Sequence, residues 1–480
     1  MQSVKTFLKT KAAIHLTAFV FICAFSLIRS TYFPEGDIFW GARNGLDTLR
    51  NGIHITQPDS WNLLTLGEEW SSNSWLWNLL LGVAYLWCGN YGFVLLTLVT
   101  NIAAFIFLWG YLQKLRMPPL GAFLTLVVSL VVMTIFMNGR SNTADFLILT
   151  AFLYLSRKYL DKPKTLLFVS FILTVLWMNL HMTGVAAIVV FPAVLFAMLH
   201  SVSLRTRLVR AVTTLLAVII ALPITPYGFE GLIKVSLVQN QSKGMMVEWS
   251  SVLKLKEGQE NIILLLLVAL VILILVFRKK QSLYGLVILA VGYGTYDTIR
   301  LAPFLLTLLL GALVFWEAEG FTLPSLGDRL IVIPDLVFGA LVVLTLALSV
   351  VSVVKTVPLI SNDEKMLYVS REELSLIPSG ARAAVSQDMG SAIILYRPDV
   401  LVTLDGRNDL IGKERFIEAS NILYADDSAK VGAWLKLHNI DTVFVQRSST
   451  EGVGIIKKNM TELGWVKNKN STDSVTYIQK

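Results

Sequence analysis

The stretch NIILLLLVALVILILVFR (261–278) carries a single charge, at its last residue. A helix that crosses a lipid bilayer needs about 20 predominantly apolar residues. We find about eleven such runs, centred near residues 21, 101, 128, 150, 171, 192, 216, 268, 289, 308 and 341. This repetition predicts a polytopic α-helical membrane protein.

The composition supports this class. Of the 480 residues, 55% are hydrophobic and only 15% are charged, whereas soluble domains are about 25% charged. The net charge of +8 therefore does not indicate nucleic-acid binding, because Lys and Arg in membrane proteins collect in cytoplasmic loops. Cys23 lies inside the first apolar run, which argues against a disulfide framework. The basic start followed by an apolar run predicts a retained N-terminal anchor.

The run WLWNLLLGVAYLW (75–87) decides the orientation. If it spans the membrane, the basic segments 113–116 and 157–164 fall outside; if it is an interfacial helix, they fall inside together with 203–210 and 277–281. The positive-inside rule favours the interfacial helix. The N-terminus is then cytoplasmic, and the acidic loop 317–329 is the exception to the rule.

With this orientation, several polar islands share the outer face. They are residues 35–37, 138–145, 177–184, 225–231, 247–251 and 296–303. The tail from residue 355 lies outside as well. Its short apolar segments 381–385, 400–404 and 441–445 alternate with helical stretches such as 427–439, which predicts an α/β domain. We therefore divide the chain into a transmembrane domain (1–354) and an extracytoplasmic domain (355–480).

The first outer loop, about residues 32–90, begins with FPEGDIFWGARNGLDTL (33–49). From Asp37 the apolar residues fall on one helical face, which predicts an amphipathic helix along the membrane surface. Glu35 and Asp37 near its start suit the helix dipole. Alternatively, Asp37 is a general base that removes a proton from an acceptor hydroxyl.

The sequence has no Walker A motif and no dinucleotide fingerprint, so it supports neither nucleotide hydrolysis nor hydride transfer. It also predicts no cytoplasmic domain for a nucleotide sugar. A lipid-linked donor is therefore favoured.

These features together resemble the GT-C superfamily of membrane glycosyltransferases, to which protein O-mannosyltransferases and aminoarabinose transferases belong. More narrowly, the chain resembles uncharacterised bacterial members of that superfamily. The resemblance covers most of the chain and rests on short motifs: DIFW…G…DS (37–60), Arg140 with Asp145, WMNLHMTG (177–184), PYG (226–228), EWSS (248–251) and DGRNDL (405–410).

The resemblance implies a catalytic role for Asp37, with Glu35 as its partner, and for Asp145 as a second acidic position. In aminoarabinose transferases such residues are thought to hold a divalent cation. Here Arg140 lies close to Asp145 in sequence and can pair with a carboxylate, so we predict no metal site among these residues, although a divalent cation stays open as a cofactor. The β-trefoil domain of protein O-mannosyltransferases is absent.

The candidates for substrate binding are Arg140, His181, Arg300, Tyr227, Glu248 and Trp249. His181 is either a phosphate donor, an acid–base group or a structural helix-end residue. Arg300 is either a phosphate clamp or the partner of Asp297. DGRNDL is either a glycan site or, as we favour, a strand-end turn with local ion pairs.

We therefore predict a hexosyl or pentosyl transferase of the bacterial cytoplasmic membrane. Its donor is a sugar on polyprenyl phosphate, and its acceptor is an envelope glycan, lipid or polymer. The alternatives are a ligase or polymerase of the O-antigen type that uses a polyprenyl-diphosphate donor, a transporter or flippase, and a scaffold without activity. Transporters place their polar residues near the midplane of the bilayer, whereas the candidates here gather at one edge.

Overall fold

The computed structural model describes residues 11–30, 36–53, 56–233, 251–254, 261–317, 351, 371–446, 450–470 and 474–479. By internal contacts the chain divides into two compact units. The helical unit comprises residues 1–32, 94–236 and 243–357, and the loop–domain unit comprises 33–93, 237–242 and 358–480. The division expected from the sequence, 1–354 and 355–480, stays a prediction about membrane placement.

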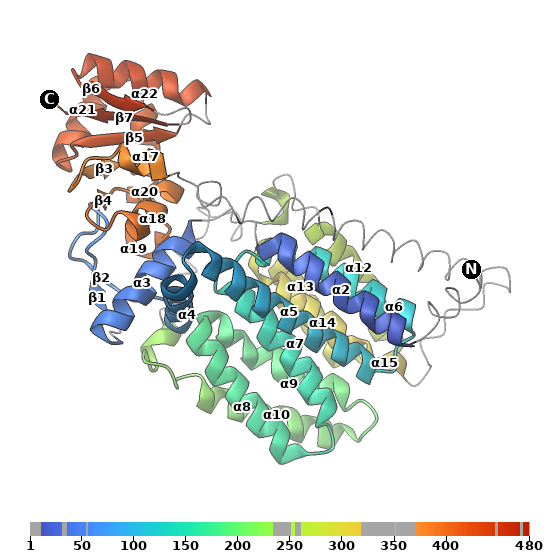
Figure 1. Ribbon diagram of the computed structural model, residues 1–480. Coiled ribbons are helices and arrows are strands. Elements are labelled where there is room, and N and C mark those ends of the chain that lie inside the picture. Colours follow the sequence, from blue (N-terminus) through green and yellow to red (C-terminus); the bar gives the residue numbers. More distant parts are fainter. Residues whose placement is uncertain are drawn as a thin grey trace. The chain divides into compact units, whose positions relative to one another are not determined.

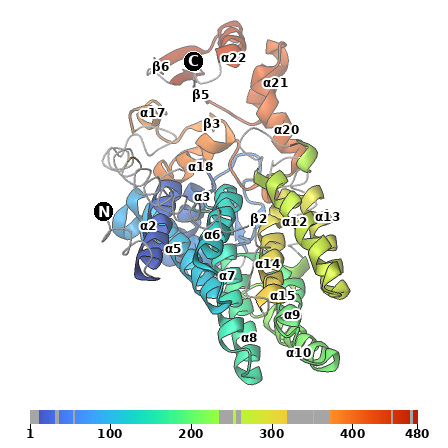
Figure 2. The ribbon, with the colours of Figure 1, turned by 90° about the vertical axis from the view of Figure 1, so that its right-hand side faces the viewer.

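The helical unit consists of helices that pack side by side with their axes along roughly one direction (Figures 1 and 2). The helices are α2 (Lys11–Ser30), α5 (Asn90–Lys114, whose first turn belongs to the other unit), α6 (Pro119–Met133), α7 (Asn142–Lys158), α8 (Pro163–Leu180), α9 (Ala187–Met198), α10 (Leu204–Ala221), α12 (Asn261–Arg278), α13 (Ser282–Asp297), α14 (Ala302–Ala312) and α15 (Val314–Glu317). Short 3-10 turns are η1 (Thr134–Phe136), η2 (Met182–Ala186), η4 (Val252–Lys254) and η5 (Ile299–Leu301).

The predicted apolar runs coincide with these helices, except that the run near residue 341 lies outside the described residues. Within the described part, four helices are long and apolar enough to cross a membrane: α5, α8, α12 and the continuous stretch Ile299–Glu317. The protein is thus a helical membrane protein, and the number of about eleven spans stays a prediction.

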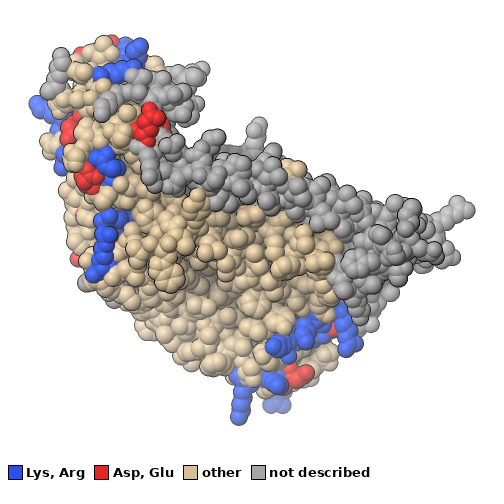
Figure 3. All heavy atoms as spheres, viewed as in Figure 1, with Lys and Arg blue, Asp and Glu red and all other residues tan. Residues whose placement is uncertain are grey.

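The two ends of the helical unit differ in charge. Successive helices joined by short connections run antiparallel, so the C-terminal ends of α5, α7 and α12 share one end with the N-terminal ends of α8 and α10. This end carries Lys114, Arg116, Arg157, Lys158, Lys162, Lys164, Arg205, Arg207, Arg210, Arg278, Lys279 and Lys280. Figure 3 shows Lys and Arg gathered at one end of an otherwise uncharged helical surface. Glu317, from the acidic loop, pairs there with Arg157.

In the loop–domain unit, the first loop forms the two helices predicted from the sequence, α3 (Asp37–Asn51) and α4 (Trp75–Cys88). Ile38, Ala42 and Leu46 are buried as the amphipathic pattern predicts, whereas Leu49 is exposed. A short hairpin, β1 (Gln57–Pro58) and β2 (Glu69–Trp70), connects the two helices. The interfacial position of α4 stays a prediction.

Glycine lets α3 and α4 approach closely. A Cβ atom at Gly45 would lie 1.9 Å from the carbonyl oxygen of Asn78, and one at Gly82 would lie 2.7 Å from the backbone of Gly45. The amide of Asn78 donates to Asn44 Oδ1 at 3.1 Å and to Ser72 Oγ at 2.8 Å. This packing fixes the direction of α3 and hence of the residues at its start.

The C-terminal domain is the predicted α/β fold. Its mixed sheet has the order β4-β3-β5-β7-β6, with β3 (Arg382–Ala384), β4 (Leu401–Val402), β5 (Thr442–Gln446), β6 (Val466–Asn470) and β7 (Ser474–Ile478). β4, β3 and β5 are parallel, and β7 is antiparallel to β5 and β6. The helices are α17 (Arg371–Ser375), α18 (Gln387–Tyr396), α19 (Asn408–Ile411), α20 (Lys413–Asn421), α21 (Ser428–Leu437) and α22 (Thr450–Glu462), with η7 (Ile422–Tyr424) after α20.

The three predicted strands and the predicted helix 427–439 are confirmed, while β6 and β7 were not predicted. The core of the domain contains strand residues such as Val443 and Tyr477 together with Trp434 of α21 and Met460 of α22. The expected linker, 354–365, lies outside the described residues.

Candidate active site

Three of the predicted site residues meet in the helical unit. Asp145 lies in the first turn of α7 and is buried. Its carboxylate accepts hydrogen bonds from Trp177 Nε1 at 2.7 Å and from Thr183 Oγ1 at 2.7 Å, and its oxygens lie 2.9 and 3.0 Å from His181 Nδ1. Among the described residues, the carboxylate of Asp145 thus binds Trp177, Thr183 and His181. The expectation that Arg140 pairs with a carboxylate stays a prediction.

The contact of His181 with Arg300 fixes the tautomer of the imidazole. Arg300 Nη2 lies 3.0 Å from His181 Nε2, and a guanidinium only donates hydrogen bonds. Nε2 therefore accepts, and the ring proton is on Nδ1, where it is donated to Asp145. The result is a chain of contacts from Asp145 through His181 to Arg300, which we call the His181 chain.

Local backbone geometry assembles this chain. The backbone of His181 is extended, with φ −159° and ψ 128°, and ends α8. The following turn is tight, because a Cβ atom at Gly184 would lie 2.8 Å from the backbone nitrogen of Met178. Arg300 lies in η5, between α13 and α14. All three residues lie at the end of the helical unit opposite to the basic end.

Of the other predicted site residues in this unit, the structure describes Arg140 and Tyr227. Arg140 precedes α7, and its backbone nitrogen donates to Asn138 Oδ1 at 3.4 Å. Tyr227 is buried in the turn after α10. Glu248 and Trp249 lie outside the described residues, as does Glu35 of the first loop.

Within the described ranges, no group of three or more His, Cys, Asp or Glu side chains is placed to hold a metal ion. Asp145 and His181 already bind each other. A divalent cation stays a prediction of the resemblance.

In the loop–domain unit, Asp37 begins α3 and is half-buried. Its Oδ1 accepts a hydrogen bond from Trp40 Nε1 at 3.0 Å. Gly406 of the C-terminal domain packs against both residues, since a Cβ atom there would lie 1.9 Å from Asp37 Oδ1 and 2.6 Å from Trp40 Nε1. The backbone nitrogen of Gly406 donates to Ser391 Oγ at 3.0 Å. Residues of the C-terminal domain thus form part of the surroundings of the Asp37 carboxylate.

A second carboxylate, that of Asp388 in α18, lies near Asp37. A Cβ atom at Gly36 would lie 3.1 Å from Asp388 Cα. Partial burial raises the pKa of Asp388, and the nearby charge of Asp37 raises it further, while a hydrogen bond from the backbone of Gly36 opposes the shift. Asp388 nevertheless keeps part of its surface open to solvent. Sequence reasoning missed Asp388 because nothing near it in the chain marks it.

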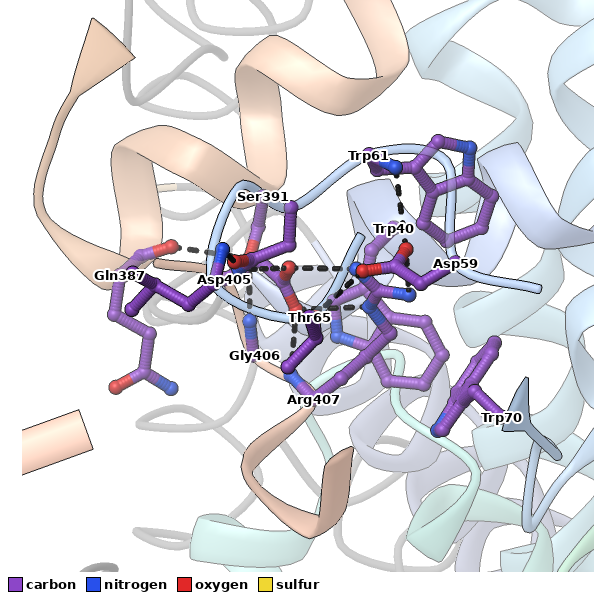
Figure 4. Close-up of polar contacts among 12 residues, drawn as sticks. Trp40, Asp59, Trp61, Thr65, Trp70, Gln387, Ser391, Asp405, Gly406 and Arg407 are labelled. Carbon is purple, nitrogen blue, oxygen red and sulfur yellow. Dashed lines mark hydrogen bonds and ion pairs between the residues drawn. The ribbon is translucent and has the colours of Figure 1, made fainter. Parts of the chain in front are cut away.

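A buried ion cluster joins the first loop to DGRNDL (Figure 4). Arg407 Nη1 donates to Asp59 Oδ1 at 2.8 Å, and its Nε and Nη2 donate to the two oxygens of Asp405 at 2.9 and 2.8 Å. The guanidinium lies 4.5 Å from the ring centre of Trp61 and 5.0 Å from that of Trp70. We call these five residues the Arg407 cluster.

The favoured interpretation of DGRNDL, a turn with a local ion pair, is therefore correct for Asp405 and Arg407. It missed Asp59, which is 348 residues away in sequence. Burial alone would raise the pKa of Asp405, but the charge and hydrogen bonds of Arg407, together with the hydrogen bond from Asn62, outweigh it and lower that pKa. Through the ion pair of Arg407 with Asp59, the cluster connects the C-terminal domain to the first loop, which also contains Asp37.

Comparison with known proteins establishes the fold. No protein-family model matches the sequence, and no curated protein matches it in sequence. Among the solved structures that it resembles is the oligosaccharyltransferase of Archaeoglobus fulgidus tethered by a disulfide to an acceptor peptide with the NVT sequon. That protein is 10% identical, with a TM-score of 0.59 over 99% of this chain and 75% of that chain.

A second structure is the archaeal oligosaccharyltransferase AglB from Archaeoglobus fulgidus in complex with an inhibitory peptide and a dolichol-phosphate. It is also 10% identical, with a TM-score of 0.56 over 92% of this chain and 70% of that chain. The chain thus has the fold of these oligosaccharyltransferases. The narrower resemblance to bacterial members stays a prediction.

Proposed function

We propose that the protein transfers a sugar from a polyprenyl-phosphate donor to an envelope glycan, lipid or polymer at the outer face of the bacterial cytoplasmic membrane. The observation that carries this proposal is the His181 chain, because it orients a guanidinium at the polar end of an apolar helical unit. The fold supports it, since one structure of that fold contains a dolichol-phosphate.

Arg300 binds the phosphate of the donor in this proposal. Arg pairs with phosphate through two parallel N–H···O bonds, which give orientation as well as charge. As the sugar leaves, negative charge grows on the phosphate oxygen, and a fixed guanidinium stabilises it without reorganisation. Asp145 and His181 are positioning residues, since they act through Arg300.

Asp37 is the general base. Its carboxylate accepts the proton of the acceptor hydroxyl while the oxygen of that hydroxyl bonds to the anomeric carbon of the donor. The bond from that carbon to the phosphate oxygen breaks, and the phosphate leaves with the electron pair. A positioned base contributes about 10²- to 10⁴-fold to such a step. The expected topology assigns both Asp37 and the His181 chain to the outer face.

The orientation follows from the basic end of the helical unit. The positive-inside rule places that end in the cytoplasm, and the N-terminus with it. The pairing of Glu317 with Arg157 supports this assignment, because it attaches the acidic loop to the basic end.

The test replaces Asp37 by Asn in the native host and compares it with Asp47→Asn. Both residues lie on α3, and Asp47 pairs with Arg43 at 3.0 Å. We expect Asp37→Asn to lower the amount of the envelope glycan product, measured by mass spectrometry, by at least about 100-fold. Asp47→Asn should leave it close to wild type. Full product from Asp37→Asn at wild-type protein level would refute the assignment of the base.

A further inference from the structure

The C-terminal domain contains a cleft of about 360 Å³, within the range of about 300–1,000 Å³ that small-molecule sites occupy. Its floor consists of buried core residues that include Leu404, Leu423 and Phe444. Its rim is more open to solvent and consists of Ser386, Gln387, Asp388, Ser420 and Tyr424. We call this the α18 cleft, because α18 begins at its edge.

The position of the cleft in the sheet is one where ligands bind. β3 is flanked by β4 on one side and β5 on the other, so the chain reverses direction across the sheet between β3 and β5. In open sheets with parallel strands, ligands bind beyond the carboxyl ends of the strands at such a reversal. Val385 follows β3, Leu404 follows β4 and Val445 lies near the end of β5, and all three line the cleft.

The lining of the cleft selects a neutral, hydroxylated ligand. Among the described residues that line it there is one acid, Asp388, and no Lys or Arg, so an anion such as phosphate would find no counter-charge. Tyr424 is 44% exposed and offers an aromatic face, while Ser386, Gln387 and Ser420 offer hydrogen-bonding groups. An aromatic face beside hydroxyl and amide groups suits a sugar ring, whose C–H faces are apolar and whose edges are hydroxyls.

Two segments that line the cleft also contact Asp37 or its neighbour Gly36. Asp388 lines the cleft, and its Cα is the atom that a Cβ at Gly36 would approach to 3.1 Å. Leu404 lines it too, and Gly406, two residues later, packs against Asp37 Oδ1. On this side, only two residues of chain separate a residue that lines the cleft, Leu404, from the residue that contacts Asp37, Gly406.

We propose that the α18 cleft binds a neutral sugar residue of the acceptor, and that Asp388 accepts a hydrogen bond from it at the edge next to Asp37. The acceptor is then a glycan or glycolipid rather than a bare lipid or an anionic polymer. The identification of this sugar as part of the acceptor rests on the proposed function. The binding of a sugar in the cleft does not depend on catalysis.

The test measures sugar binding directly. The full-length protein is placed in lipid nanodiscs, which contain no sugar-based detergent. Saturation-transfer NMR then measures binding of the methyl glycosides of glucose, mannose, galactose and N-acetylglucosamine at millimolar concentrations. Binding is compared among wild type, Tyr424→Ala, Ser420→Phe and Ile417→Ala. Ile417 is the control, because it lies on α20, is 45% exposed and does not line the cleft.

We expect at least one glycoside to bind, and its binding to weaken by about tenfold in Tyr424→Ala, the scale of losing one well-placed aromatic contact. Ser420→Phe should block it by filling the cleft, and Ile417→Ala should leave it unchanged. No binding by any of the four glycosides, or equal binding in wild type and both cleft variants, would overturn the inference. Asp37→Asn should bind as wild type does, so a failed base assignment and a failed cleft assignment give different results.

Discussion

Replacing Arg407 by Met tests whether the Arg407 cluster holds the first loop on the C-terminal domain. Arg407 and its two carboxylate partners are almost completely buried, with side-chain exposures of 1% for Arg407 and 0% for Asp59 and Asp405. Met keeps an unbranched side chain that packs in an apolar site, but it is shorter than Arg and removes the charge and its hydrogen bonds. Two carboxylates then stay buried without a counter-ion.

The expected cost follows from this burial. Removing one partner of a buried ion pair costs about 3–5 kcal/mol, because the remaining charge is left without compensation. At 1.36 kcal/mol for each factor of ten, the opened form of the unit becomes roughly 150- to 5,000-fold more populated. The loss of stacking on Trp61 and Trp70 adds to the cost in the same direction.

The assay is native-state proteolysis of the full-length protein, with cleavage sites mapped by mass spectrometry. Its rate follows the population of the opened form when opening is fast relative to cleavage. Cleavage of Arg407→Met should rise within residues 56–72 and 371–446, because the cluster joins these two segments.

Arg415→Met is the matched control. Arg415 also connects the first loop to the C-terminal domain, through Glu68 at 2.6 Å, but the two side chains are 46% and 44% exposed. Exposed pairs contribute about 0–1 kcal/mol, so its cleavage rate should rise no more than about fivefold. Equal rates for Arg407→Met and Arg415→Met would refute the structural role of the cluster.

Two further predictions concern packing and pH. Gly45→Ala should destabilise the α3–α4 pair by about 1–3 kcal/mol and lower the melting temperature, since its Cβ would lie 1.9 Å from Asn78 O. The control is Gly454→Ala on α22, which has open space around its Cβ and should leave the melting temperature unchanged or raise it. A lower melting temperature for Gly454→Ala than for Gly45→Ala would contradict the close contact of α3 with α4. Because the pKa of Asp405 is lowered in the folded state, its contribution is present above its unfolded pKa of about 3.9 and is lost as pH falls through its folded pKa. Urea unfolding of wild type should therefore show stability falling below about pH 4, whereas Arg407→Met, whose buried carboxylates gain from protonation, should lose less stability or gain some over the same range.

The sequence by itself determined the features that depend on local patterns. The apolar runs predicted the helices of the helical unit, because a segment that is apolar all round must be buried in lipid or protein. The amphipathic spacing after Asp37 predicted α3, because apolar residues on one helical face must be buried. Alternating apolar segments predicted β3, β4 and β5.

The candidate site was predictable only in part. Asp145, His181 and Arg300 were selected one by one as polar residues at the ends of apolar helices, and the structure brings them into contact. Their order, with buried Asp145 at one end and partly exposed Arg300 at the other, follows only from which atoms meet. The sequence indicated only that Arg140, close to Asp145 in the chain, can pair with a carboxylate; it did not indicate that Asp145 binds Trp177, Thr183 and His181.

Only the tertiary structure decided which distant residues surround Asp37. Asp388 and Gly406 lie more than 300 residues away along the chain, and no periodicity connects them to α3. Asp59 and Arg407 are likewise joined only by packing. Periodic patterns record which face of an element is buried, but not against which other element it is buried, because any apolar surface of suitable shape satisfies the hydrophobic effect. The pairing is specified by close fit, such as that of Gly406 against the carboxylate of Asp37, and this fit exists only once the chain has folded.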